Sequence, residues 1–240
     1  MLDLPDTGWT QVREGRHELL FEHGPLGPDE QPGHGHSDAL SFELIWDGAQ
    51  VIKDSGASEY QGPVRAYERS ARAHATATVD GEGPDELWKD FRAGGRAQVT
   101  GSAPRGADKI RLLRASLRAW QGWTHERRIA FRPGRALVVQ DEVRARKGAL
   151  VESRLTLAPG FSFAGGRLLG PRPLELRVLR GEVSAVEEGS CASGFGQRVP
   201  RQVLVLRADA GQVAYALCAP GVEAALLPGG VLLDGAEVAP

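Results

Sequence analysis

Residues 33–46 read Gly33-His34-Gly35-His36-Ser37-Asp38-Ala39-Leu40-Ser41-Phe42-Glu43-Leu44-Ile45-Trp46. In the second half of this stretch an apolar residue occupies every second position, from Leu40 to Trp46. Because successive side chains of a strand point to opposite faces, this alternation predicts a half-buried β-strand. The pair Asp47-Gly48 follows, and it is typical of a tight turn into the next apolar run, residues 49–53. We therefore predict a β-hairpin with His36 near its mouth.

Apolar runs recur through the rest of the chain, separated by breaks rich in glycine and proline. This rhythm predicts an all-β fold, a large antiparallel β-sandwich of about a dozen or more strands. Residues 110–120 fit a helix or a strand equally well, and we predict a strand because the neighbouring runs are strands. The chain shows no internal repeat or linker, so we expect residues 1–240 to form a single domain. The runs are residues 110–120, 128–131, 136–143, 150–157, 174–179, 203–206, 213–218 and 231–233.

Two segments do not follow the strand pattern. Residues 55–72 have no clean period and carry Tyr60, Arg65, Tyr67 and Arg69, so we predict a loop that lies over a site. Residues 85–90 are predicted to form one helical turn.

The composition is that of an ordinary globular protein. Charged residues make up 25% of the 240 residues and the net charge is -2, so we expect no nucleic-acid partner. No apolar run has the roughly eighteen residues of a membrane helix, and the acidic start of the chain differs from a signal peptide. We therefore expect no membrane segment and no export signal in this chain. Cys191 and Cys218 lie in strand-like surroundings and are predicted to be buried thiols.

Histidines and aspartates gather between residues 32 and 81. Three of the six histidines, His34, His36 and His74, fall there with Asp38 and Asp54. Imidazole and carboxylate groups suit zinc or another first-row metal. His34 and His36 would leave the same face of a strand, Asp54 ends one apolar run and His74 opens another, so these groups can converge on one point. The other interpretation is that the histidines only form hydrogen bonds at strand ends.

The same residues resemble a known family. The stretch quoted above, the run Val51-Ile52-Lys53-Asp54-Ser55-Gly56 and the run Tyr67-Glu68-Arg69-Ser70 leading to Ala73-His74-Ala75-Thr76 resemble, in order and spacing, the C-terminal β-sandwich domain of heparinase II/III-like polysaccharide lyases. A weaker likeness continues through Thr124-His125-Glu126-Arg127-Arg128 and beyond, and covers roughly residues 9 to 220. Two positions depart from the family pattern, which usually has Asn where Ala75 stands and Pro where Ser55 stands.

The resemblance implies roles for individual residues. In such lyases the residues that match His36, Asp54 and His74 hold one zinc ion, generally regarded as structural, and we expect zinc there. The residue that matches His34 is an active-site histidine, so His34 is the catalytic candidate; the alternative is that His34 only orients His36. Asp38, Glu43 and His125 are expected to be structural. Substrate contacts are expected from phenol and guanidinium groups, namely Tyr60, Arg65, Tyr67 and Arg69.

The resemblance also implies a reaction. Such lyases cleave uronate-containing acidic polysaccharides by β-elimination, and an N-terminal helical toroid supplies the catalytic tyrosine. We therefore expect an acidic polysaccharide as ligand and a helical-toroid domain or protein as partner. The location would be periplasmic or secreted if the chain is part of a full-length lyase, and cytoplasmic if it stands alone.

Two other functions stay open. The first is a non-catalytic carbohydrate-binding or interaction module that keeps zinc for stability. The second is a non-haem iron oxygenase that uses His36, Asp38 and His74, because a His-x-Asp pair with a distant histidine is the facial triad of such enzymes. This second alternative leaves Asp54 unexplained.

Overall fold

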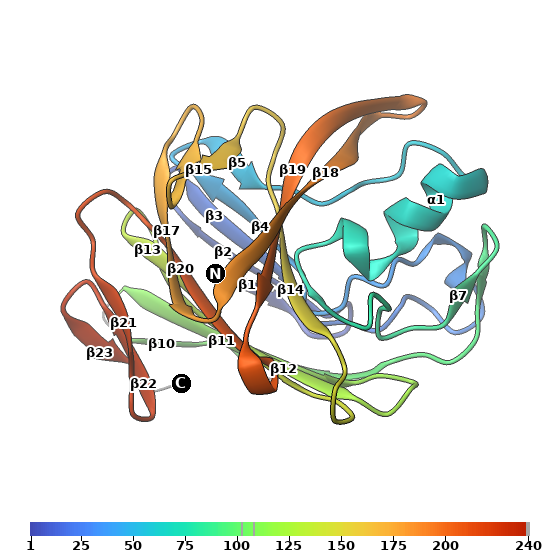
Figure 1. Ribbon diagram of the computed structural model, residues 1–240, viewed down its shortest axis with the longest axis horizontal. Helices are drawn as coiled ribbons and strands as arrows, with labels where there is room; N and C mark the ends of the chain where they lie inside the picture. The colour runs from blue at the N-terminus through green and yellow to red at the C-terminus, as the bar shows by residue number, and fades with distance from the viewer. Residues whose placement is uncertain (102, 108, 239–240) are drawn as a thin grey trace.

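The structure is a computed structural model that describes residues 1–101, 103–107 and 109–238 (Figure 1). Within these ranges the chain forms 23 strands, one α-helix and three short 3-10 helices. The strands make several antiparallel sheets that pack face to face. The predicted all-β sandwich of a dozen or more strands is confirmed.

The N-terminal sheet contains the predicted hairpin. β3 pairs with β4 so that Leu19 lies opposite Leu44 and Phe21 opposite Phe42, and all four side chains are buried. β4 then turns into β5 at Asp47-Gly48, as the alternation predicted. In spatial order this sheet is β1 (Leu2–Leu4), β2 (Trp9–Glu14), β3 (His17–Glu22), β4 (Phe42–Trp46) and β5 (Ala49–Ile52).

Two further sheets complete the sandwich. One has the order β10 (Arg105–Ala107), β11 (Ile110–Arg118), β12 (Thr124–Arg132), β13 (Ala136–Arg144), β20 (Gln212–Cys218), β17 (Leu174–Arg180), β16 (Arg167–Leu169) and β15 (Ser162–Ala164), with β9 (Gln98–Gly101) also on β11. The other has the order β18 (Glu182–Gly194), β19 (Gln197–Arg207), β14 (Val151–Thr156) and β6 (Ala77–Val79). Small sheets are formed by β21 (Ala224–Leu227), β22 (Gly230–Leu233) and β23 (Ala236–Val238), and by β7 (Leu87–Trp88) and β8 (Arg92–Ala93).

One apolar cluster lies between the three main sheets. It joins Leu44 of β4, Leu137 of β13 and Leu204 of β19, all fully buried. A backbone hydrogen bond from Lys53 to Thr156 (3.1 Å) ties the end of β5 to β14. The end of the N-terminal sheet is therefore fixed beside the β14–β19 sheet, where the candidate site lies.

Residues 110–120 contain the predicted strand, β11, but the two irregular segments differ from their predictions. Residues 55–72 contain α1 (Gly62–Arg69), whose first turn holds Pro63, a residue suited to that place. The helix lacks an apolar period because the residues it buries are Arg65, Glu68 and Arg69. Residues 85–90 form part of the β7–β8 hairpin instead of a helical turn, because Lys89 turns the chain with φ 51°.

No helix among the described residues has the length and apolar character needed to cross a membrane. Cys191 and Cys218 are free and buried, as predicted.

Candidate functional site

The site lies where the 32–41 loop meets the end of β5 and the segment that follows α1. This loop begins with a 3-10 helix (Pro32–His34) and leads into β4. A second 3-10 helix (Ala71–Ala73) follows α1 and places His74 at its end. Gly35 has to be glycine, because a Cβ there would lie 2.1 Å from the carbonyl oxygen of Leu26. The loop is thus packed closely against the chain behind it.

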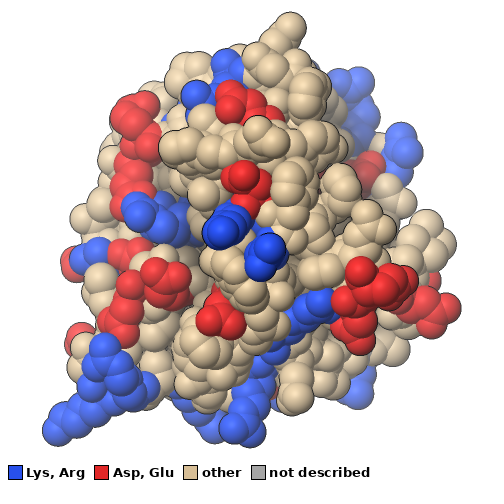
Figure 2. Space-filling view, turned by 90° about the vertical axis from the view of Figure 1, so that its right-hand side faces the viewer, with Lys and Arg blue, Asp and Glu red and all other residues tan. Residues whose placement is uncertain are grey.

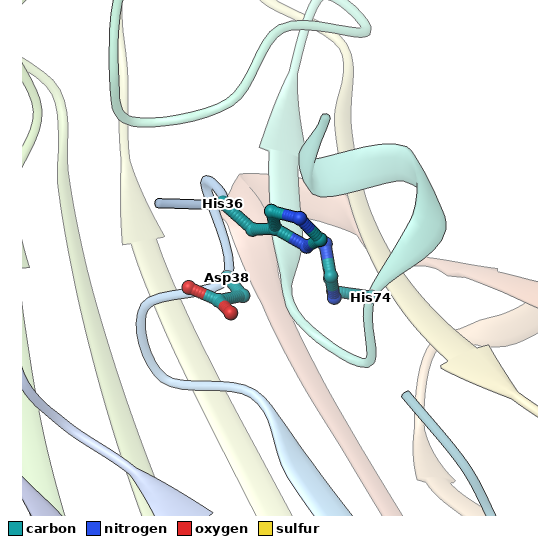
Figure 3. Close-up of side chains that lie close together, drawn as sticks. All are labelled: His36, Asp38 and His74. Carbon is teal, nitrogen blue, oxygen red and sulfur yellow. The ribbon is translucent and has the colours of Figure 1, made fainter. Parts of the chain in front are cut away.

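The two histidines and Asp38 come together at this point (Figure 3). One ligand atom from each of His36, Asp38 and His74 lies within 4.8 Å of the others. The ring centroids of His36 and His74 are 5.3 Å apart. The structure therefore brings together the two histidines predicted as metal ligands, and adds Asp38, which was expected to be structural.

Asp54 contacts His74 directly. Its Oδ2 lies 2.5 Å from Nδ1 of His74, and on the other side of the ring Nε2 lies 2.9 Å from the carbonyl oxygen of Glu68. A carbonyl oxygen only accepts, so Nε2 of His74 carries a hydrogen. The charged Asp54 carboxylate also only accepts, so Nδ1 carries a hydrogen as well and His74 forms an ion pair with Asp54; Nδ1 is the atom that would offer a lone pair to a metal ion once that hydrogen is lost.

His36 is held from the opposite side by α1. The Nη1 atom of Arg65 lies 2.8 Å from Nε2 of His36, and since a guanidinium group only donates, Nε2 accepts. Burial lowers the pKa of His36 to about 3, and the nearby charge of His74 acts in the same direction. His36 is therefore a neutral imidazole at pH 7, and its one ring lone pair, which accepts from Arg65 here, is the one that it would offer to a metal ion in place of that hydrogen bond.

The carboxylates beside the histidines have perturbed pKa values. Burial opposes the charged form of Asp54, yet His74 holds the pKa of Asp54 below its usual range. Burial also disfavours protonated His74, but Asp54 raises the pKa of His74 above its ordinary value. For Asp38, burial raises the pKa to about 7, although His74 opposes that shift. The site thus pairs a charged Asp54 with His74, next to neutral His36.

Arg65 and Arg69 hold the 32–35 part of the loop. Both are only 1% exposed. Arg65 donates to the carbonyl of Gly33 (3.0 Å), and Arg69 donates to the carbonyls of Pro32 and Gly35 (3.2 and 2.9 Å). We expected both arginines to contact substrate; the structure instead uses their guanidinium groups inside the protein to position the loop, because one face of α1 is buried against it.

Two further arginines hold the backbone next to the site and were not identified from the sequence. Arg127 of β12 donates to the carbonyl of Leu40 (2.6 Å) and to that of Ala75. Arg201 of β19 donates to the carbonyls of Lys53 (2.5 Å) and Ala73 (2.6 Å). Each of these carbonyls lies within two residues of Asp38, Asp54 or His74. The site is thus preorganised by guanidinium groups on surrounding elements.

Arg127 supports an unusual backbone conformation. Leu40, which is fully buried, has φ 64°, a left-handed value that is uncommon for leucine. Its neighbour Ala39 accepts a hydrogen bond from the Thr76 hydroxyl (2.7 Å). These contacts fix the tight turn that carries Asp38 into β4.

The remaining predicted residues lie at different depths. His34 is exposed and its ring makes an edge contact with Tyr60, 5.5 Å between centroids. Tyr60 is 41% exposed and sits over the Arg65 guanidinium, 5.5 Å from ring centroid to Cζ. Tyr67 is half-buried, and a Cβ on Gly189 of β18 would lie 3.0 Å from its hydroxyl oxygen. His34 and Tyr60 are thus open to a ligand, whereas Tyr67 packs against β18.

His125, which was expected to be structural, lies in the core. Its Nε2 is 2.8 Å from Oδ1 of Asp141, and its side chain is buried. Because Arg127 also donates to Asp141, His125 belongs to the same buried hydrogen-bond network as Arg127.

The donor set fits a first-row metal ion. Two imidazoles converge with the carboxylate of Asp38, and Asp54, which lies outside this group, pairs with Nδ1 of His74. Residues His36 and His74 would hold the ion, with Asp54 or Asp38 as the carboxylate ligand. Such an ion would connect three segments of chain that are already held by arginines.

Comparison with known proteins agrees with the resemblance seen in the sequence. The family model for the heparinase II/III-like C-terminal region matches residues 1–225. A search among curated proteins returned no match.

Solved structures share the fold. Heparan sulfate lyase HepC from Pedobacter heparinus has a TM-score of 0.74 at 16% identity, over 97% of this chain and 40% of its own. The structure described as the heparinase III-BT4657 gene product has a TM-score of 0.72 at 18% identity, with the same coverage of 97% and 40%. The chain thus spans about 40% of the length of these proteins. It belongs to the heparinase II/III-like family of polysaccharide lyases and corresponds to the C-terminal domain of that family.

Proposed function

We propose that this chain is the zinc-binding β-sandwich part of a polysaccharide lyase that cleaves uronate-containing acidic polysaccharide by β-elimination. The observation that carries the proposal is the convergence of His36 and His74 with the half-buried carboxylate of Asp38 and with Asp54 beside His74, next to the exposed imidazole of His34, on a domain of this family. A helical domain or partner would supply the rest of the chemistry.

The ion is assigned a structural role. Zinc, when bound, supplies a fixed positive charge that joins the 32–41 loop to the end of β5 and to His74. We assign His36, Asp54 and His74 as its ligands, because the Glu68 carbonyl holds Nε2 of His74, and an ion that replaced the hydrogen between Nδ1 and Asp54 would contact both of these groups. Asp38 is the competing carboxylate, since it lies within 4.8 Å of both histidines.

His34 is assigned to the reaction itself. β-Elimination requires a base at the carbon next to the uronate carboxylate, neutralisation of that carboxylate, and an acid for the leaving oxygen. The His34 side chain is exposed and can donate a hydrogen bond to a carboxylate or relay a proton. The catalytic tyrosine is assigned to the helical part.

Metal content tests the ligand assignment. Purified chain should hold about one zinc per molecule by elemental analysis, and Asp54→Ala should abolish binding while Asp38→Ala retains it. Asp29→Asn, at an exposed aspartate outside the site, is the matched control and should keep full zinc content. Zinc retained in Asp54→Ala and lost in Asp38→Ala would move the assignment to Asp38. Bound iron in place of zinc would instead support the oxygenase alternative, whose His-x-Asp and distant histidine also meet here.

Activity measurements test whether catalysis needs both this chain and a helical part. The chain alone should produce little unsaturated uronate, followed by ultraviolet absorbance, from heparan sulfate, alginate or hyaluronan. Addition of a helical-toroid partner should restore cleavage, because groups that act as a unit fail together when one is missing. In the reconstituted enzyme His34→Ala should lower kcat more than it raises KM. Full activity of the chain alone would refute the proposed need for a helical partner. No activity with the partner would favour a non-catalytic carbohydrate-binding module.

A further inference from the structure

Three aromatic side chains form an exposed cluster next to His34. Tyr60, Phe91 and Phe195 are 41%, 43% and 71% exposed. The ring centroids of Tyr60 and Phe91 are 6.2 Å apart, and those of Tyr60 and Phe195 are 5.5 Å apart. We call these three rings the aromatic platform. Large apolar groups left together in water are unfavourable, so such a patch indicates a binding surface.

The segments that carry the platform are pinned to one another. Phe195 lies at the tip of the β18–β19 hairpin, where the Gly196 amide donates to the Ser58 carbonyl (2.7 Å). Phe91 lies in the β7–β8 turn, where Asp90 accepts a hydrogen bond from the Gly62 amide (2.8 Å). In Figure 1 this hairpin tip, α1 and β7 all lie at the same end of the molecule. A ligand would therefore meet a preformed surface and lose little affinity to ordering it.

The platform adjoins the candidate catalytic histidine. The His34 ring is 5.5 Å from the Tyr60 ring and 6.4 Å from the Phe91 ring, both as edge contacts. One side of Tyr60 is covered by the Arg65 guanidinium. Because Arg65 also contacts His36, this buried arginine links the exposed platform to the histidine pair beneath it.

Unpaired positive charges flank the platform. Lys89 and Arg92 lie on either side of the Phe91 turn, and Arg198 follows Phe195 on β19. All three are exposed, and none of them forms an ion pair within the described part of the chain. Two acids oppose these charges: Glu59, which is exposed next to Tyr60, and the half-buried Asp90 between Lys89 and Phe91. Figure 2, which views this end, shows basic and acidic groups spread over the face with uncharged surface between them.

We propose that the aromatic platform is a saccharide-binding subsite that stacks sugar rings of an anionic oligosaccharide on Phe91 and Phe195, while Lys89, Arg92 and Arg198 bind its carboxylate or sulfate groups. Aromatic faces bury the apolar faces of sugar rings, and guanidinium and ammonium groups suit anionic oxygens. The choice of saccharide as the ligand rests on the proposed function. The subsite lies entirely within this chain, so binding needs no helical partner.

Calorimetric titration of the purified chain with size-defined alginate and heparan sulfate oligosaccharides tests this subsite. Phe91→Ala and Phe195→Ala should each weaken binding about fivefold, since each removes part of the burial of one aromatic side chain. Leu169→Ala is the matched control at an exposed apolar residue of β16 and should leave the affinity unchanged. Lys89→Ala should weaken binding, whereas Lys147→Ala, at an exposed lysine between β13 and β14, should not. Melting temperatures of all variants show that the fold is intact.

The outcomes separate this inference from the proposed function. Absence of binding, or binding that both phenylalanine variants leave unchanged, would overturn the subsite even if zinc content and lyase activity with a partner agree with the proposal. Equal binding of neutral dextran would overturn the role of the three cations. If the phenylalanine variants instead weaken association with a helical-toroid protein and the chain binds no saccharide, the platform is a domain interface and the inference is wrong. Saccharide binding with the expected losses, in a chain that holds no zinc and shows no activity even with a helical-toroid partner, would support the subsite and refute the lyase assignment.

Discussion

Replacement of Arg127 by methionine tests the buried support beneath the site. The Arg127 side chain is fully buried, and its Nε and Nη2 atoms donate to the two carboxylate oxygens of Asp141 at 2.7 and 2.8 Å. Its Nη1 donates to the carbonyls of Leu40 and Ala75. Methionine fills most of the same space and provides none of these donors. The variant therefore isolates the electrostatic contribution from the packing contribution.

The expected loss of stability is large. Removal of one partner of a buried ion pair costs about 3–5 kcal/mol, because the other charge stays buried. Two backbone carbonyls also lose their donor, at about 1–3 kcal/mol for each group left without one. The Asp141 carboxylate keeps hydrogen bonds from His125 (2.8 Å) and Ser153 (2.6 Å), which offsets part of the loss. We expect the free energy of unfolding to fall by about 5 kcal/mol, a large share of the total for a typical domain.

Urea unfolding followed by tryptophan fluorescence measures this change. Arg135 is the matched control, because it also pairs with both oxygens of an aspartate, Asp234, at 2.7 and 2.6 Å, but is about half exposed. Arg135→Met should cost less than about 1 kcal/mol. The double variant Arg127→Met with Asp141→Asn should recover part of the loss, since it removes the unpaired charge. A loss below about 1 kcal/mol for Arg127→Met, or a double variant as unstable as the sum of its parts, would refute the reasoning.

Three further predictions follow from other contacts. Chelation should lower the melting temperature in differential scanning calorimetry and added zinc should restore it, since a ligand at 100 times its Kd stabilises by about 2.7 kcal/mol; an unchanged melting temperature would contradict a zinc-binding folded state. Gly35→Ala should destabilise the fold in urea because its Cβ would meet the Leu26 carbonyl oxygen at 2.1 Å, whereas Gly194→Ala, whose nearest neighbour is 3.8 Å away, should be tolerated. Burial lowers the pKa of His125, so the unfolded chain binds a proton below about pH 6.5 that the folded chain does not, and the free energy of unfolding should fall as pH drops by up to about 1.4 kcal/mol per unit. His125→Asn should reduce that slope, and an equal slope would exclude His125 as its source.

The sequence predicts those features that depend on residues close to one another along the chain. The alternation from Leu40 to Trp46 predicts β4 because one face of that strand packs on the core. The spacing of His36 and the family pattern at His74 predict two members of the site. These two patterns can be recognised in the sequence because each depends on the residue types at nearby positions.

Other features depend on partners far along the chain. Arg127 and Arg201 look like exposed strand residues, and their burial becomes favourable only when Asp141 or distant carbonyls reach them. α1 was missed because the face that it buries is charged. Asp38 was expected to be structural because nothing in the local pattern shows that its carboxylate comes close to His74.

The contacts of Arg127 and Arg201 join residues that are far apart along the chain, and this separation sets the order in which the site forms during synthesis. Arg127 is 87 residues from Leu40, and Arg201 is 148 residues from Lys53. Hairpins such as β2–β3 need only local chain and form early, whereas contacts between distant segments form slowly. His36 and His74 leave the ribosome long before the strand that carries Arg201. The site therefore completes only after β19 has emerged and paired, so a chain that stalls before that point has its histidines but not their alignment.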